Sequence, residues 1–168
     1  MKTVNGHDVP SKEEISRKVK EIEKTFAKTA GISNVKSTVD FDNYIITVSC
    51  NFSSVAKLNT VVKNIQEVEK SATKIDEQFY GYDAVSKTFS RFNKNSFKKD
   101  YQKLSNADKE IFSSANYTFI TKFETEVLSS SNKEAKLSAS KKAVMLKLNM
   151  LDLITEKKSM ENKINLTK

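Results

Sequence analysis

The chain contains few of the residues on which enzyme active sites most often depend. Its 168 residues include one histidine, His7, one cysteine, Cys50, three glycines, one proline and no tryptophan. His7 lies in a stretch without expected structure, so it has no partner in fixed geometry for metal binding or acid–base catalysis. The three glycines never cluster, which argues against a glycine-rich phosphate loop. We therefore expect no metal and no cofactor.

Cys50 is too isolated for an internal disulfide or a multi-cysteine metal site. It is in phase with Ile46, Val48 and Phe52 in an alternating segment. Free cysteine is among the most buried residue types. We interpret Cys50 as a small core residue, and a reactive thiol is the alternative.

Long apolar runs are also missing. None reaches the ~18 residues of a membrane span, and the first ten residues lack the apolar core of a signal peptide. Either the protein is cytosolic, or a signal segment once preceded Met1. The scarcity of Gly and Pro leaves little material for linkers. We expect a flexible segment over 1–10 and a single α+β domain over 11–168.

The charge is strongly positive and carried almost wholly by lysine. The chain has 29 Lys and Arg against 21 Asp and Glu, a net charge of +8, and its only arginines are Arg17 and Arg91. Lysine lacks the planar fork with which arginine reads guanine edges or clamps phosphates. A lysine-rich surface favours solubility or loose attraction to anionic surfaces over sequence-specific recognition.

The stretch 116–150 has the clearest pattern. Over 117–127 apolar or aromatic residues and threonines alternate with mostly polar ones, as in a half-buried strand. A serine-rich loop over 129–132 follows, then a short strand within 135–140 and a turn at Lys141 and Lys142. The alternation returns over 143–150. The residues that it places on one face of each long strand are Tyr117, Phe119, Thr121, Phe123, Thr125 and Val127, and Val144, Leu146, Leu148 and Met150.

The other patterns add helices and hairpins. Ser11 and Glu14 form a capping box that starts a helix over 11–30. Ser53 or Ser54 caps a second helix, which fades between 67 and 71. Further predictions are hairpins over 35–52 and 78–92, short helices near 97–104 and from 105, a helical turn over 151–154 and a final strand within 159–167. Together they predict an α+β fold: a mostly antiparallel sheet of about six to eight strands with helices packed on one face.

Carboxylates offer little sign of catalysis. Glu124 and Glu126 share a strand face, but two like charges on a solvated face are the ordinary case. Asp152 stands between two leucines, where a cap for the helical turn is the simpler interpretation. An enzyme built on carboxylates alone is the least favoured of the functions considered, and we expect a protein that is not an enzyme.

The most suggestive local signal is the stretch 87–103, in which aromatic and basic residues interleave. It holds six basic residues and one acidic residue. Interleaved aromatic and basic residues also occur on strands that stack nucleobases and hold phosphates. The plain interpretation places Phe92 and Phe97 in the core and the lysines in water. The alternative is an anion-binding surface made of Lys87, Arg91, Lys94, Lys98, Lys99 and Lys103.

A group of segments carries a resemblance to known proteins: 115–119, Ala135 with 137–138, 144–153 and 164–166, with 88–91 in the middle of the chain. The first four resemble the closing segment of uncharacterised envelope lipoproteins of Bacteroidetes-type bacteria, and 88–91 is similar to their aromatic strand. The resemblance implies a lipid-anchored protein of the cell envelope with no assigned activity, and no functional residues carry over. One departure is that no cysteine near the N-terminus could carry a lipid.

Two functions follow as expectations. The first is a non-enzymatic envelope domain with a binding or assembly role, whose partner is an anionic lipid or an envelope protein. If its sheet curls around the helices, the aromatic face could hold an acyl chain. The second is a cytoplasmic module that binds anions or nucleic acid through 87–103.

Overall fold

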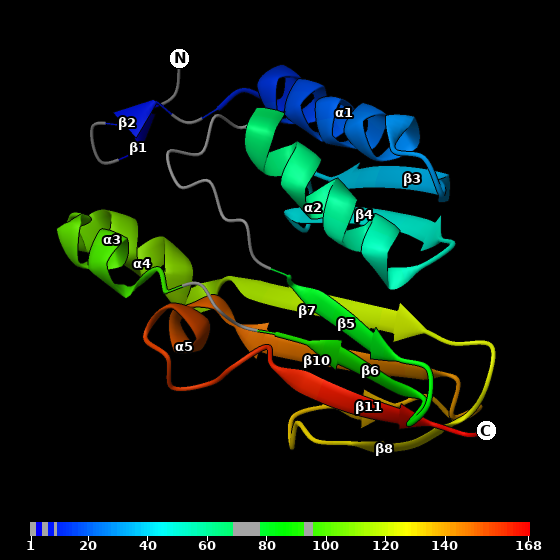
Figure 1. Ribbon diagram of the computed structural model, residues 1–168. Helices are drawn as coiled ribbons and strands as arrows, with labels where there is room; N and C mark the ends of the chain where they lie inside the picture. The colour runs from blue at the N-terminus through cyan, green and yellow to red at the C-terminus, as the bar shows by residue number, and fades with distance from the viewer. Residues whose placement is uncertain (1–2, 5–6, 9, 69–77, 93–95) are drawn as a thin grey trace. The chain divides into compact units, whose positions relative to one another are not determined.

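The computed structural model describes residues 3–4, 7–8, 10–68, 78–92 and 96–168. The chain forms two compact units, Met1–Gln78 and Phe79–Lys168, and each is described by itself (Figure 1). The sequence carries no glycine- or proline-rich linker at this division.

The N-terminal unit combines helices with antiparallel hairpins. Among the described residues of the segment 1–10, Val4 pairs with His7 in a short ladder. The elements, in chain order, are β1 (Thr3–Val4), β2 (His7–Asp8), α1 (Lys12–Lys28), β3 (Ile32–Asp40), β4 (Ile45–Phe52) and α2 (Val55–Val68).

Helix α1 begins at the predicted capping box and packs against β3 and α2. The Ser11 backbone N–H donates to the Glu14 carboxylate over 2.7 Å, and the Glu14 N–H donates to Ser11 Oγ over 3.1 Å. At the other end, Asn64 Nδ2 of α2 donates to Thr29 Oγ1 over 3.0 Å. The two helices are thereby joined by a side-chain hydrogen bond next to the buried Val61.

The connection from α1 to β3 requires glycine. Gly31 has φ +86°, and a Cβ there would lie 2.6 Å from Ser53 Oγ and 2.8 Å from Lys57 Cγ. We expect Gly31→Ala to lower the free energy of unfolding by about 1–2 kcal/mol, because alanine is strained at positive φ and meets both side chains. Urea denaturation followed by circular dichroism measures the loss. Gly31→Asn tolerates positive φ better but carries the same Cβ, so it should also lose stability through the contacts with Ser53 and Lys57. An unchanged midpoint for alanine would contradict the assignment.

The C-terminal unit contains most of the strands. Its elements, in chain order, are β5 (Tyr80–Asp83), β6 (Thr88–Arg91), α3 (Lys98–Lys103), α4 (Asn106–Ser114), β7 (Asn116–Lys122), β8 (Val127–Ser130), β9 (Lys136–Leu137), β10 (Ala143–Asn149), α5 (Met150–Ile154) and β11 (Asn162–Leu166).

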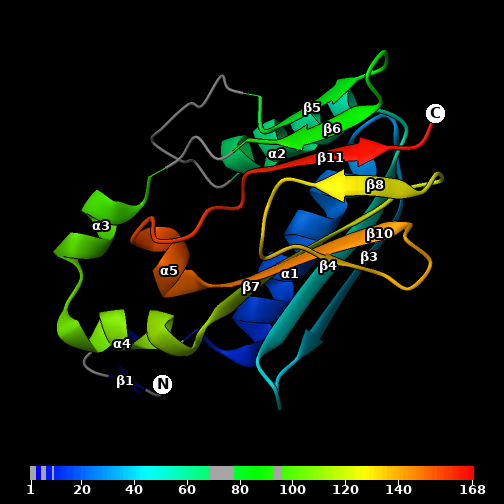
Figure 2. The same cartoon turned by 90° about the horizontal axis from the view of Figure 1, so that it is seen from below.

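These strands form two antiparallel sheets. One has the order β5-β6-β11-β8 and the other β7-β10-β9, and in Figure 2 the first appears as four neighbouring arrows. The chain passes from one sheet to the other between β7 and β8. In the first sheet Arg91 is the direct partner of both Tyr80 and Asn162. Direct partners share a face of a sheet, so these three side chains form one row.

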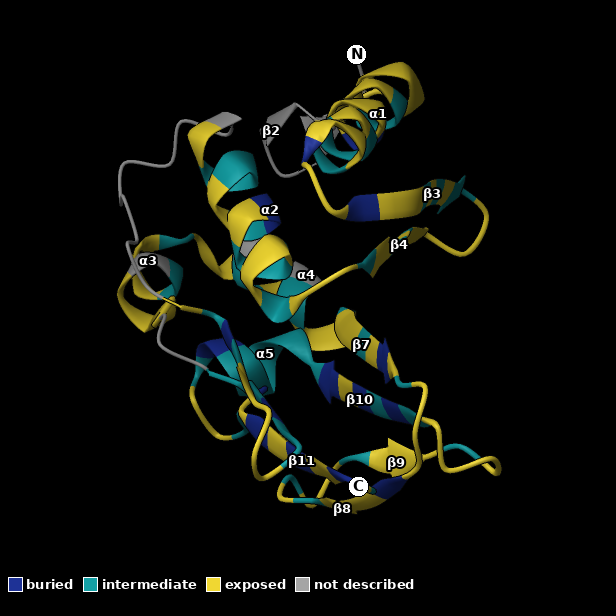
Figure 3. Ribbon diagram, turned by 45° about the vertical axis from the view of Figure 1, so that its right-hand side comes forward, coloured by how far each residue is buried: buried dark blue, intermediate teal, exposed yellow. Residues whose placement is uncertain are grey.

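The inner faces of the two sheets pack against each other through aromatic rings. Tyr80 stacks on Phe119 at 5.8 Å between ring centroids, and Phe89 meets the edge of Phe123 at 5.6 Å. Along β10, residues 144, 146 and 148 are buried while Lys147 is exposed (Figure 3). The core therefore lies between the sheets, as the alternation over 143–150 predicted.

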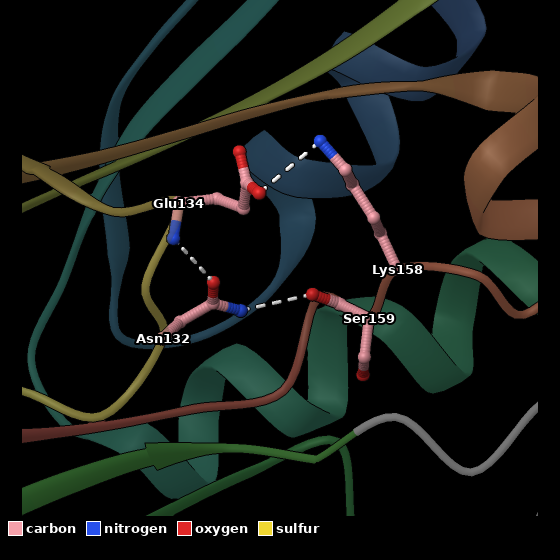
Figure 4. A network of polar contacts seen from close by, with 4 residues as sticks. All are labelled: Asn132, Glu134, Lys158 and Ser159. Carbon is pink, nitrogen blue, oxygen red and sulfur yellow. Dashed lines mark hydrogen bonds and ion pairs between the residues drawn. The ribbon is translucent and has the colours of Figure 1, made fainter.

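A polar network holds the loop after β8 against the start of β11 (Figure 4). Asn132 Nδ2 donates to the carbonyl oxygens of Ser159 and Glu161 over 2.9 and 2.8 Å. Its Oδ1 accepts from the Glu134 N–H over 3.0 Å. The Glu134 carboxylate and Lys158 Nζ are 3.1 Å apart at the surface. One asparagine side chain thus fixes both loops, while the exposed ion pair adds little.

The predicted α+β class and the antiparallel pairing are confirmed. The strands, however, form separate sheets rather than one. The long strand expected over 117–127 ends at Lys122, and the expected serine loop is in part β8. Ser130, the last residue of β8, and Ser131 directly after it donate to Asn162 Oδ1 over 2.9 and 3.3 Å. These hydrogen bonds fix the serines beside β11. The hairpin at β5 and β6, the short β9, the turn α5 and the final strand lie where they were predicted.

Candidate anion-binding site

The described bases of the stretch 87–103 lie on different elements and differ in exposure. Lys98, Lys99 and Lys103 are exposed on α3, whereas Lys87 is half-buried in the turn before β6. Arg91 is half-buried, in a row that faces the second sheet. Lys94 lies outside the described residues.

The aromatic residues of this stretch divide between core and surface. Phe89 is 2% exposed and shares its face with Arg91, as the alternation predicted. Phe92 is half-buried over Gly81, where a Cβ would lie 3.2 Å from two atoms of its ring. The absence of a side chain at Gly81 therefore leaves space for the ring of Phe92. The prediction that Phe97 is a core residue is wrong, since it is 59% exposed directly before α3.

Arg91 is enclosed by three aromatic rings. Its Cζ lies 4.1 Å from the centroid of the Phe119 ring, 5.5 Å from that of Tyr117 and 5.8 Å from that of Tyr80. These distances are typical of cation–π contacts. The rings come from β5 and β7, so both sheets position the guanidinium.

The guanidinium lacks a hydrogen-bonding partner at one end. Among the described residues nothing accepts from its Nη1, which is buried. Beside it lies a cavity with a volume of about 10 Å³, close to the space that one water molecule needs. An acyl chain does not fit there. The residues that line the cavity are Phe89, Arg91, Phe119, Thr121, Val144, Leu146, Met160, Asn162 and Ile164.

A second basic feature, which sequence reasoning missed, is the outer face of β7, β10 and β9. Ile120, Met145 and Lys136 are direct partners in one row, and Lys147 pairs with Thr118 in another. Ile120 is 54% exposed. We call this surface the lysine face and define it by Thr118, Ile120, Lys122, Lys136, Met145 and Lys147.

The lysine face contains no carboxylate. The nearest acids along the chain are Glu124, which follows β7, and Glu134, which precedes β9 and forms an ion pair with Lys158. Lys141 and Lys142 add two exposed bases at the turn before β10. The alternation in β7 and β10 indicates which of their side chains point away from the core. That Lys136 belongs to the same face follows only from the pairing of β9 with β10.

The positive charge is concentrated in the C-terminal unit. Residues 79–168 contain 17 Lys and Arg against 10 Asp and Glu, a net charge of +7, whereas 1–78 contain 12 against 11, a net charge of +1. An electrostatic attraction to an anionic partner therefore acts mainly on the C-terminal unit.

The candidate catalytic residues do not converge in the described structure. The predicted capping role of Asp152 is wrong: Asn149 Oδ1 caps α5 by accepting from the Leu151 N–H over 2.8 Å, and Asp152 lies in the first turn. Burial raises the pKa of the Cys50 thiol, which disfavours the reactive thiolate. The described residues contain no cluster of histidine, cysteine and acidic side chains suited to a metal ion.

The carboxylates whose pKa values shift belong to turns. Hydrogen bonds lower the pKa of Asp40, and the largest effect comes from the side chain of Asn43. The Ser86 and Val85 N–H groups lower the pKa of Asp83 in the turn between β5 and β6. Both carboxylates stabilise hairpin turns, and neither faces the cavity at Arg91.

Within the described ranges, no helix has the length and apolar character that crossing a membrane requires. Comparisons with protein-family models, curated proteins and solved structures give no match.

Proposed function

We propose that the protein is a non-enzymatic binding domain that attaches to an anionic lipid surface through the lysine face. The observation that carries the proposal is the composition of this face: outward lysines on three strands surround the exposed Ile120, and no carboxylate interrupts them. Lysines attract lipid phosphates, while an aliphatic side chain can enter the headgroup region.

The same face is poorly suited to nucleic acid. Single-stranded nucleic acids bind where aromatic side chains stack on bases, but the aromatic residues of β7 lie in the other phase, with Phe119 packed against Arg91 and Tyr80. Lysine also lacks the bidentate geometry that reads bases. The chemistry of the lysine face therefore favours a lipid surface.

The expected affinity is modest. Each lysine near an anionic membrane contributes about 1 kcal/mol, so Lys122, Lys136 and Lys147 together supply roughly 3 kcal/mol. Burial of Ile120 adds up to about 1.5–3 kcal/mol. The sum corresponds to reversible attachment that weakens as salt screens the charges.

Co-sedimentation with vesicles tests the proposal. We expect the protein to pellet with vesicles of phosphatidylcholine and phosphatidylglycerol, and not with phosphatidylcholine alone. Lys122→Glu with Lys147→Glu should reduce the bound fraction at least about tenfold, since it replaces two attractions by two repulsions.

The matched control reverses two exposed lysines of the same unit away from the lysine face. Lys133 lies in the loop after β8, and Lys163 pairs with Ser90 in the other sheet. Lys133→Glu with Lys163→Glu changes the net charge equally. Equal losses for the two double variants would mean that net charge, and not the lysine face, drives attachment, and the proposal would fail.

A cell-envelope location fits this proposal and stays a prediction drawn from the resemblance. A second candidate, binding of nucleic acid through α3, has one observation in its favour: Phe97 is 59% exposed directly before the exposed Lys98 and Lys99. A salt titration with single-stranded DNA tests it. Binding through several phosphates gives a steep linear decline of log affinity with log salt concentration.

A further inference from the structure

The surroundings of Arg91 explain its position but not its hydrogen bonding. Phe119, Tyr117 and Tyr80 present ring faces to the guanidinium, and a ring face attracts a cation without accepting all of its N–H groups. Among the described residues, the Nη1 group remains buried without an acceptor. A buried charged donor without a partner is costly, and native structures seldom keep one without a reason.

Among the described residues, no carboxylate lies beside this arginine in its sheet row or in the cavity lining. The direct partners of Arg91, Tyr80 and Asn162, are uncharged, and the described residues that line the cavity include no acid. Asn162 Oδ1 already accepts from Ser130, Ser131 and Asn132. The site is therefore a fixed positive charge with an unfilled donor in apolar surroundings, where electrostatic attraction is strong.

The cavity limits what can fill this position. A volume of about 10 Å³ admits one atom of roughly the size of water. A phosphate or sulfate group is too large, whereas a halide or one carboxylate oxygen fits after a small movement of the adaptable Met160 side chain. We propose that Arg91 anchors a binding site for a small monovalent anion, such as chloride or the carboxylate of a small ligand. This site is independent of the lysine face.

Thermal unfolding in different salts tests the site on the full chain. Each salt also has a general effect on Tm, which is strongest for the excluded sulfate ion and is independent of any site. At matched ionic strength, sodium chloride, sodium bromide or sodium acetate, but not sodium sulfate, should therefore widen the difference in Tm between the unmodified protein and Arg91→Met. An anion at about five times its Kd should widen it by about 2–4 °C for a chain of this length. Stabilisation by both halides but not by acetate assigns the site to a halide, and stabilisation by acetate assigns it to a carboxylate.

Arg91→Met removes the charge while keeping an apolar chain between the sheets. Its Tm should show only the general effects of the salts, and the additional difference between small anions and sulfate that the unmodified protein shows should be absent. Lys122→Glu with Lys147→Glu should retain that difference, which separates this site from the lysine face. If Arg91→Met retains it, the proposal is wrong.

Bromide also tests the unmodified protein directly, whether or not the methionine variant folds. In crystals grown in sodium bromide, we expect an anomalous peak within hydrogen-bonding distance of Arg91 Nη1. A water molecule at this position, together with the same response of Tm to small anions in the unmodified protein and in Arg91→Met, would overturn the proposal.

Discussion

Asn162→Ala is expected to lower the free energy of unfolding of the C-terminal unit by about 2–4 kcal/mol. The side chain is 4% exposed, and its Oδ1 accepts from Ser130 Oγ, Ser131 Oγ and the Asn132 N–H over 2.9, 3.3 and 3.0 Å. Alanine leaves these donors without their acceptor inside the structure, and each buried unsatisfied donor costs about 1–3 kcal/mol. Chemical denaturation followed by circular dichroism measures the change.

Asn165→Ala is the matched control on the same strand. Asn165 also makes two side-chain hydrogen bonds, with Thr88 Oγ1 over 2.9 Å and Ser129 Oγ over 2.8 Å, but it is exposed. Water replaces these bonds in the variant, so the loss should stay below about 1 kcal/mol. Similar losses at both positions would contradict the account of Asn162 as a buried acceptor.

Phe89→Ala should have a still larger effect, a loss of about 3–5 kcal/mol. Phe89 is 2% exposed, and its ring contacts Tyr80 at 6.0 Å and Phe123 at 5.6 Å between centroids. Removing it deletes one of the aromatic contacts between the two sheets and leaves a cavity in their shared core. The same denaturation measurement tests this prediction. The variant and the unmodified protein are both measured at reduced temperature, where more of the variant is folded.

Phe97→Ala is the control for Phe89, because the two residues belong to the same basic and aromatic stretch. Phe97 is 59% exposed, so its loss should change stability by no more than about 0.5 kcal/mol. A large loss at Phe97 with a small one at Phe89 would reverse the assignment of core and surface and contradict the packing described above.

Much of the fold was predictable because it depends on local patterns. The capping box at Ser11 and Glu14 marked the start of α1, and the alternation over 143–150 identified both the strand and its buried face. The division of strands between two sheets was not predictable in the same way. It depends on the bend between Lys122 and Val127, where the chain leaves one ladder for another.

The candidate sites were harder to predict because they depend on pairs of distant residues. An arginine in a basic stretch is ordinarily assigned to the surface, and only the approach of Phe119 and Tyr117 on β7 shows that Arg91 is half-buried. The lysine face likewise requires the register that places Lys136 beside Met145. Sequence periodicity indicated that Lys147 points outward but not which side chains surround it.

The central claim is that the lysine face binds anionic lipid. NMR spectra of the full chain, recorded with and without nanodiscs containing phosphatidylglycerol, test it most directly. We expect amide signals of β7, β9 and β10 to shift or broaden, most strongly near Ile120 and Lys147, and those of α3 to remain unchanged. Perturbations confined to Lys98–Lys103, with the lysine face unaffected, would contradict the account.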